Sequence, residues 1–252
     1  MGAINSIFDL YFWPTPNGYK LSIMLEELGV DYQLVPINIA EGEQHDERFD
    51  IVSPNHKIPA LTHYVGDDRT PVHLFESGAI LLYLGDWSKR FIPTEACAYR
   101  DCLMWLMWQM GSAPFVGGGF GHFYNYAPFK IEYAINRYAM ETKRQLHVLD
   151  THLADKDYMA GDEYTIADMA IWPWYGSIMR SAYNSQEFLS VHEYKNLDRW
   201  VERVGERDAV KRGFMVNRTF GGPETQLRER HDASDFEKNR QDMVEARGGD
   251  RV

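Results

Sequence analysis

The sequence predicts a chain of two structural classes, an α/β domain over residues 1–88 and an all-α domain over residues 96–213. Up to residue 88, short apolar strands alternate with helical segments, whereas beyond residue 95 apolar side chains recur at helical spacing alone. A proline-containing linker, residues 89–95, joins the two domains. Residues 214–252 are polar and charged without a helical stripe, which is typical of disorder or of an arm lying on a surface.

The α/β domain begins with a strand over residues 8–12, where large apolar residues alternate with more polar ones. Apolar side chains at helical spacing between residues 21 and 28 then predict a helix, and Gly29 ends this helix as its C′ residue. The turn between the two elements, residues 14–18, therefore lies where the strand exits the sheet.

The rest of this domain continues the alternation. Residues 31–38 predict a second strand, and Pro36 within it favours the edge of the sheet because proline has no N–H to donate. The later elements are a polar loop with a short helix (39–50), a strand entered after Pro59, a hairpin turn (66–70), a strand (72–75) and a buried helix (79–87) that starts on Ser77. This order is the thioredoxin-like arrangement, in which ligand sites tend to lie at strand ends and helix N-termini.

The second domain is predicted to be helical throughout. Apolar residues recur at i, i+3, i+4 and i+7 from Leu103 to Met110, and tryptophans lie on a neighbouring face, so we expect this helix to be covered nearly all round. A second long helix covers the apolar repeat between residues 131 and 153. A capping box at residues 165–168 opens a third helix, with its aspartate in a structural role, and residues 196–213 supply one or two short helices.

Composition and charge exclude several classes of function. A net charge of −11 and a pI near 5.3 argue against nucleic acid or an anionic membrane as the main partner, because phosphate binding needs clustered Lys and Arg. The N-terminus lacks the features of a signal peptide and no run is long enough to span a bilayer, so we expect a cytoplasmic protein. His147 and His152 are five positions apart and His122 is isolated, so no metal site is expected.

The two cysteines, Cys97 and Cys102, are also five positions apart. This spacing differs from the C-x-x-C of a dithiol redox centre. Any thiol chemistry must therefore use a thiol brought from outside the chain.

The stretch Tyr11–Lys20 carries the first candidate site. Two prolines flank Thr15 and restrict the backbone, so its hydroxyl is held rigidly at the strand exit. Asn17 is a good N-cap for the helix that follows, and the first N–H groups of that helix point to the same place. The turn is therefore either a seat for an anion, or an ordinary turn in which Thr15 and Asn17 only finish the strand and cap the helix.

The second candidate site is the pair Glu76 and Ser77 at the start of a helix. Ser77 can bind a carboxylate with its hydroxyl and the N–H groups behind it, and Glu76 can pair with an ammonium group. The alternative is a helix cap beside a surface charge. A glycine run at residues 117–121 suits a close loop that presents Tyr124 and Tyr126, and it is no phosphate cradle because no Gly-Lys-Ser/Thr follows.

Six stretches together resemble the Nu-class glutathione transferases, and the likeness covers nearly the whole chain. They are YFWPTPNGYK, PNHKIPAL, LFESGAILLYL, GGGFGHFYNYAPFKIEYAINRY, GDEYTIADMAIWPW and RERHDASDF. The resemblance implies a homodimer of chains with a thioredoxin-like N-terminal domain and an all-helical C-terminal domain, with glutathione bound between the domains. It also implies that the charged tail packs across the dimer near the mouth of the active site.

The resemblance also implies roles for particular residues. Thr15 and Asn17 match the hydrogen-bonding partners of the glutathione sulfur and are the predicted catalytic residues. The predicted glutathione-binding residues are Asn17, Gln44 at the glycyl end, Lys57, Ile58 before a proline that is cis in the family, Glu76 and Ser77 at the γ-glutamyl end, and Arg137. The predicted pocket for a second substrate comprises Trp13, Tyr124, Tyr126, Trp174 and Tyr183, although for Trp174 a packing role in the core is the preferred interpretation.

These residues suggest a mechanism in which the nucleophile belongs to glutathione. A free thiol titrates near about pH 8.5, and each strong hydrogen bond to the thiolate contributes on the order of 1.5 to 3 kcal/mol, which lowers its pKa by roughly one to two units. The first hypothesis is reduction of small disulfides by glutathione, with two glutathione molecules or their disulfide in the site. The alternatives are glutathione-dependent cleavage of aromatic thioethers and a non-catalytic glutathione-binding scaffold.

Overall fold

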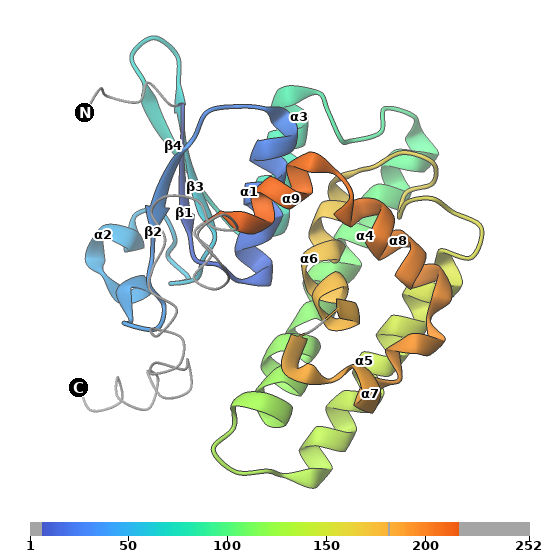
Figure 1. Ribbon diagram of the computed structural model, residues 1–252. Coiled ribbons are helices and arrows are strands. Elements are labelled where there is room, and N and C mark those ends of the chain that lie inside the picture. Colours follow the sequence, from blue (N-terminus) through green and yellow to red (C-terminus); the bar gives the residue numbers. More distant parts are fainter. Residues whose placement is uncertain (1–6, 181, 217–252) are drawn as a thin grey trace. The chain divides into compact units, whose positions relative to one another are not determined.

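The computed structural model describes residues 7–180 and 182–216. Contacts between residues divide the chain into two compact units, one comprising Met1–Leu84 with the segment from Asp208 onward, the other Gly85–Arg207. Each unit has the class that the sequence predicts, a small mixed sheet with helices and a helical bundle (Figure 1). The predicted position of the tail concerns residues that lie almost entirely outside the described part of the chain.

The first unit is a four-stranded sheet in the order β2-β1-β3-β4. Its strands are β1 (Phe8–Phe12), β2 (Gln33–Pro36), β3 (Ala60–Val65) and β4 (Thr70–Phe75). Helices α1 (Pro16–Leu28), α3 (Ser77–Ser88) and α9 (Asp208–Met215) lie on one side of the sheet, whereas the short α2 (Glu47–Asp50) lies on the other (Figure 1). Strand β2 pairs in parallel with β1 and is the first strand in the sheet order. This confirms the edge position that Pro36 predicted.

The register of the sheet determines where the site residues lie. Tyr11 on β1 pairs with Ala60 on β3, and Ala60 pairs in turn with Phe75 on β4. The end of β1, the start of β3 and the end of β4 therefore meet at one edge of the sheet. The segments that carry the predicted site residues leave the sheet at this edge.

Burial of alternate side chains holds this sheet against α1. Phe8, Leu10 and Phe12 are fully buried, whereas the residues between them are only half-buried. Leu21 and Met24 on α1 are fully buried as well. Each such side chain contributes about 1.5 to 3 kcal/mol relative to an exposed one, so the alternation in β1 fixes which face of the strand meets the helix.

Helix α9 belongs to the first unit, which differs from the predicted helical domain of residues 96–213. It packs on α1, where Ser22 Oγ donates to the Gly213 carbonyl oxygen at 2.7 Å and Arg212 pairs with Glu26 at 2.8 Å. The backbones approach so closely that a Cβ on Gly213 would lie 2.7 Å from the backbone of Ile23. Sequence periodicity shows that α9 is a helix but not which helix it packs against.

The second unit consists of helices around a buried core. They are α4 (Ala96–Pro114), a π-helical segment (Phe115–Tyr126), α5 (Glu132–His152), α6 (Ile166–Arg180), α7 (Gln186–Leu189) and α8 (Lys195–Gly205). The packed pairs include α4 with α6, α6 with α8, and α5 with the π-helical segment. No helix in the described part of the chain is both long and apolar enough to cross a bilayer.

Asp168 has the structural role that the capping box predicts. Its Oδ2 accepts hydrogen bonds from the N–H and the hydroxyl of Thr165, and its Oδ1 accepts from the Met159 N–H and from Trp200 Nε1. Burial raises the pKa of this carboxyl to about 6 even though these donors lower it. The side chain thus ties the start of α6 to α8 and to the turn before α6.

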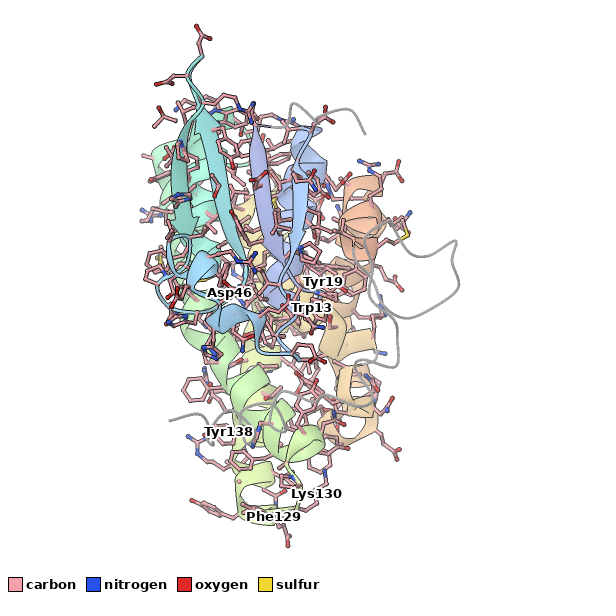
Figure 2. All side chains as sticks on the ribbon, turned by 90° about the vertical axis from the view of Figure 1, so that its left-hand side faces the viewer. Trp13, Tyr19, Asp46, Phe129, Lys130 and Tyr138 are labelled. Atoms are coloured by element: carbon pink, nitrogen blue, oxygen red, sulfur yellow. The ribbon has the colours of Figure 1, made fainter. Side chains whose placement is uncertain are left out.

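The glycine run forms part of the π-helical segment, so the predicted close loop was wrong. A Cβ on Gly117, Gly119 or Gly121 would lie 2.3 to 2.5 Å from an aromatic side chain, namely those of Trp174, Tyr138 and Tyr183. The glycines therefore let aromatic rings pack directly on the helix backbone. One of these aromatic residues, Tyr138 on α5, is labelled in Figure 2.

The sequence predicted that helix α4 would be covered nearly all round, but one of its faces is exposed in the single chain. Leu106 is fully buried, but Met104 and Met107 are each 55% exposed. These two methionines are three residues apart and so lie on one face of the helix. The apolar repeat correctly located the helix but could not show that part of its apolar surface faces outward in a single chain.

Candidate active site

Thr15 is the N-cap of α1. Its backbone is extended, with φ −122° and ψ 161°, and its Oγ1 accepts a hydrogen bond from the Gly18 N–H at 3.2 Å. Asn17 is therefore not the N-cap that the sequence predicted, because Pro16 and Asn17 already form the first turn of the helix. Since the Thr15 oxygen accepts from the helix, the hydroxyl proton can be donated to an anion in front of it.

The γ-glutamyl end of the predicted site lies at the start of α3. Ser77 is 8% exposed and its Oγ accepts a hydrogen bond from Lys20 Nζ at 3.2 Å. Glu76 is exposed with a left-handed backbone, φ +68°, and its carboxylate accepts a hydrogen bond of 3.4 Å from Asn55 Nδ2. These contacts join α1, the start of α3 and the loop before β3. Together with the sheet register, they place Thr15, Glu76 and Ser77 at one edge of the sheet.

Lys20 is a residue of this edge that the sequence reasoning missed. It is 1% exposed, and burial lowers its pKa to about 7 although the charge of Glu76 acts in the opposite direction. The sequence contains a signal, because Lys20 lies one turn before Met24, on the face that the helix buries. A lysine on the buried face of an amphipathic helix is rare unless it is paired.

The glycyl end of the predicted site lies in the segment before β3. Gln44 is 8% exposed and lies in the one-turn helix Glu43–His45, and its backbone oxygen is 3.2 Å from His56 Nδ1. Its side-chain Oε1 is buried and has no hydrogen-bond partner in the described part of the chain. Figure 2 labels Asp46 in this segment, at the end of the sheet where Trp13 and Tyr19 also lie.

Ile58 and Lys57 complete the set in the first unit. The Ile58–Pro59 bond is cis, as the resemblance implied, and it leads directly into β3. Ile58 is half-buried against a small apolar cluster that includes Phe49 and Val52. Lys57 is exposed, and its backbone is held by hydrogen bonds with the Ser53 hydroxyl.

In the second unit the structure brings together three of the predicted aromatic residues. The rings of Tyr126 and Tyr183 meet edge to face with centroids 5.6 Å apart, and Phe120 contacts both Tyr124 and Tyr183. Burial, and then the neighbouring Tyr126, raise the pKa of Tyr183 above its ordinary value, so this phenol stays protonated and can act as a hydrogen-bond donor. Figure 2 labels Phe129 and Lys130 in the turn beyond this segment.

The remaining predicted residues occupy different environments. Trp174 is half-buried and lies on the backbone at Gly117, which supports its packing role. Arg137 is exposed on α5. Trp13 belongs to the first unit and is fully buried.

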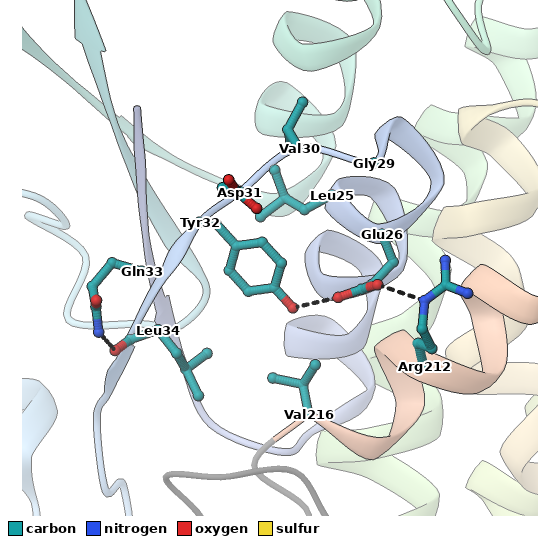
Figure 3. A pocket seen from close by; sticks show the side chains of 10 residues that line it. All are labelled: Leu25, Glu26, Gly29, Val30, Asp31, Tyr32, Gln33, Leu34, Arg212 and Val216. Carbon is teal, nitrogen blue, oxygen red and sulfur yellow. Dashed lines mark hydrogen bonds and ion pairs between the residues drawn. The ribbon is translucent and has the colours of Figure 1, made fainter. Parts of the chain in front are cut away.

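A pocket of about 480 Å³ in the first unit contains none of the predicted site residues (Figure 3). It lies at the C-terminal end of α1, the end opposite Thr15, between β2 and α9. Glu26 Oε1 accepts from the Tyr32 hydroxyl at 3.0 Å and the same carboxylate pairs with Arg212. Burial and Glu26 raise the pKa of Tyr32, and the Glu26 carboxylate is already paired with Arg212 of the protein itself.

The chain's own thiols are poorly suited to chemistry at this site. Cys102 is fully buried, and burial raises the pKa of its thiol. Cys97 is exposed on α4, and the two do not form a disulfide. In the described residues, no group of three His, Cys, Asp or Glu side chains could hold a metal ion.

Comparison with known families identifies the class of protein. Residues 7–86 match the family model of the glutathione S-transferase N-terminal domain, and residues 112–208 match that of the C-terminal domain. The chain therefore belongs to the glutathione S-transferase family of enzymes, as the sequence motifs indicated.

Individual relatives narrow this class. The disulfide-bond oxidoreductase YghU of Escherichia coli K12 is 53% identical over 241 residues, which covers 93% of this chain and 83% of the relative. A crystal structure of glutathione transferase YghU from Streptococcus pneumoniae, complexed with glutathione, is 47% identical in sequence and has a TM-score of 0.81. The match covers 85% of this chain and 84% of the chain in that structure. A Pseudomonas putida glutathione transferase with one glutathione disulfide bound per subunit is 36% identical with a TM-score of 0.79, covering 84% and 93%.

Proposed function

We propose that this protein reduces small disulfides with glutathione, whose thiolate it stabilises at the start of α1. The observation that carries the proposal is the meeting of Thr15, Glu76 and Ser77 at one edge of the sheet, with a Thr15 hydroxyl that has its proton available. The similarity to a disulfide-bond oxidoreductase and to two glutathione-bound structures supports it.

The residues at this edge fit glutathione. Ser77 at the start of α3 suits the γ-glutamyl carboxylate, and Glu76 suits the ammonium group beside it. The buried Oε1 of Gln44 needs a donor, because a buried carbonyl without one costs free energy, and a ligand N–H supplies it. Ile58 offers its backbone to the cysteinyl residue, and Lys57 supplies positive charge in the same segment.

Thr15 and Asn17 act on the sulfur. The Thr15 hydroxyl donates a hydrogen bond to the thiolate, and the Asn17 amide and the N-terminus of α1 add further stabilisation. Glutathione supplies the nucleophile: its sulfur attacks one sulfur of the disulfide and the other leaves as a thiolate. A second glutathione then completes the exchange, so that two glutathione thiols are oxidised to glutathione disulfide while the substrate disulfide is reduced to two thiols.

A second reaction is supported by the tyrosines of the second unit. In this reaction a second glutathione thiolate attacks the sulfur of an aromatic thioether of glutathione, so that glutathione disulfide forms and the carbon leaves with the bonding electrons. The carbon then takes up a proton, so the reaction needs a proton donor. Tyr183 lies beside Tyr126, and Phe120 contacts both Tyr124 and Tyr183, so these rings of the second unit suit a flat substrate. The cluster of aromatic side chains around Tyr183 is the observation that favours this alternative.

We also propose that the protein is a cytoplasmic homodimer. Met104 and Met107 place exposed apolar surface on one face of α4, and adaptable methionines are common at interfaces. Replacement of both by lysine should shift the protein toward monomer in analytical ultracentrifugation. An unchanged sedimentation coefficient would rule out this face as the interface.

Steady-state turnover tests the proposed reaction. Wild-type protein is given glutathione and a small disulfide, and glutathione disulfide formation is followed with a coupled reductase; aromatic thioethers are tried in parallel. We expect turnover with disulfides, and Asn17→Ala should lower it by about tenfold, the value of one charge-assisted hydrogen bond. Glutathione binding without turnover on either class of substrate would instead support a non-catalytic binding protein.

A further inference from the structure

Lys20 is a charged side chain in the core of the first unit, at 1% exposure. A buried ammonium group costs free energy unless opposite charge or hydrogen bonds compensate it. We infer that Lys20 is a positioning residue of the glutathione site, which holds the Ser77 hydroxyl and takes up a proton when the γ-glutamyl carboxylate binds. The inference rests on the proposed function and assigns a regulation of the same site by pH.

The contact between Lys20 and Ser77 determines the direction of the serine hydroxyl. Lys20 Nζ donates to Ser77 Oγ at 3.2 Å, so the serine oxygen acts as an acceptor on that side and its own proton is directed elsewhere. Ser77 begins a helix of 12 residues, whose N-terminal N–H groups and dipole favour an anion at the same point. A carboxylate bound there would receive the serine proton and lie one hydrogen bond beyond the ammonium group.

The charged groups around Lys20 leave its charge only partly compensated. Burial lowers its pKa to about 7, and Glu76, next to Ser77, raises it by a smaller amount. Among the described residues on the elements packed on α1, Asp9 on β1 accepts from a tyrosine hydroxyl on β3, and Arg212 on α9 pairs with Glu26. Deprotonation of Lys20 is therefore accessible near neutral pH in the ligand-free protein.

Binding of a carboxylate at Ser77 changes this balance. The new negative charge, one hydrogen bond beyond Lys20, favours the ammonium form and raises the pKa of Lys20, whereas the ligand's own ammonium group pairs with Glu76. A ligand that raises the pKa takes up a proton wherever the free lysine is neutral, that is above about pH 7. Affinity for glutathione should therefore be highest below about pH 7 and fall as the pH rises.

The test measures binding of S-methylglutathione by isothermal titration calorimetry between about pH 6 and pH 8. This ligand keeps both carboxylates and the ammonium group but has no thiol to titrate. Measurements in buffers of different ionisation enthalpy give the number of protons taken up. We compare wild type, Lys20→Met, Lys20→Arg and, as a matched control, Lys211→Met, which removes an exposed lysine from α9 in the same unit.

For wild type and Lys211→Met we expect the dissociation constant to rise about fivefold to tenfold over this range, with about half a proton or more taken up at pH 8. Lys20→Met should bind about tenfold more weakly at pH 6, and Lys20→Arg, which keeps its charge, should bind without this proton uptake. With glutathione and a disulfide, Lys20→Met should raise KM for glutathione and leave kcat within about threefold, because Thr15 is unchanged.

Two results are separable. If wild type does not bind S-methylglutathione, the proposed function itself fails. If wild type binds it without proton uptake between about pH 7 and 8, or if Lys20→Met shows the same pH profile as wild type, the inference about Lys20 is wrong while the glutathione site stands. Because the wild-type measurement alone can overturn the inference, the test does not depend on the folding of a variant.

Discussion

Replacement of Thr15 separates two roles that one hydroxyl combines. Its oxygen caps α1 by accepting from the Gly18 N–H at 3.2 Å, and in the proposed mechanism its proton is donated to the glutathione thiolate. Loss of an N-cap costs about 1 kcal/mol of stability. Loss of a hydrogen bond to a charged group costs about 1.5 to 3 kcal/mol, which corresponds to a fall in rate of about 10-fold to 100-fold.

Three variants resolve these contributions. Thr15→Ser keeps the cap and the proton and should retain activity within about threefold. Thr15→Ala loses both, so we expect about 10-fold to 100-fold lower kcat/KM together with about 1 kcal/mol lower unfolding free energy. Thr15→Gly should lose as much activity as Thr15→Ala but only a few tenths of a kcal/mol of stability, because glycine is a tolerable cap.

The assays are disulfide turnover with a coupled reductase and equilibrium unfolding in urea. Wild-type rates in Thr15→Ala would refute a catalytic hydroxyl. Activity that followed stability across the series, with Thr15→Gly near wild type, would show that Thr15 acts through the cap alone. Only a loss of activity in both Ala and Gly variants, with unequal losses of stability, agrees with the proposed mechanism.

Three further changes test other parts of the structure. In the wild type, buried N–H groups donate to the Asp168 carboxylate, and Asp168→Asn would place an amide N–H₂ against some of them. The unfolding free energy measured in urea should therefore fall by about 3 kcal/mol. A loss below about 1 kcal/mol would contradict the buried network. Gly213→Ala should lower the unfolding free energy by about 1 to 3 kcal/mol, because its Cβ would meet the Ile23 backbone at 2.7 Å. The control Gly111→Ala, with nothing within 4 Å of its Cβ, should be neutral or stabilising by up to about 1 kcal/mol. Equal effects of the two substitutions would exclude the close α1–α9 contact. Cys97→Ser combined with Cys102→Ser should leave kcat for disulfide reduction within about threefold, after correction for stability, because the nucleophile is not a protein thiol; loss of turnover would assign the chemistry to the chain.

Much of the secondary structure of the first unit can be predicted from local sequence patterns. Alternation of apolar residues in β1 and the C′ position of Gly29 were both predicted correctly, and Gly29 has φ +68° as that role requires. Such features depend on neighbours in sequence, so periodicity and turn chemistry are enough to find them.

The features that were missed depend on contacts distant in sequence. Gly213 lies in a short helical stretch whose partner, Ile23, is 190 positions earlier, and nothing local indicates that pairing. The glycines near Gly119 suggested a loop, yet they lie in a π-helical segment where aromatic rings of α5 and α6 need the space of a missing Cβ. Tertiary packing there overrides the usual tendency of glycine to break helices.

The structure brings together Thr15, Glu76 and Ser77 of the predicted site, but it differs from the prediction in local detail. The motifs located Thr15, Glu76 and Ser77, and the sheet register explains why they gather. The assignment of the cap to Asn17 was wrong because Pro16 fits the first helical position, which shifts the cap to Thr15. Lys20 was overlooked because a lysine in an amphipathic helix is usually assigned to the solvent face.

The most direct test of the central claim is the pKa of the glutathione thiol in the complex, measured by titrating the ultraviolet absorbance of the thiolate with wild-type protein and with Thr15→Ala. The proposed mechanism predicts a value roughly one to two units below the ordinary thiol pKa of about 8.5 in the wild-type complex, and a return toward 8.5 in the variant. A bound thiol that titrates like free glutathione would contradict it.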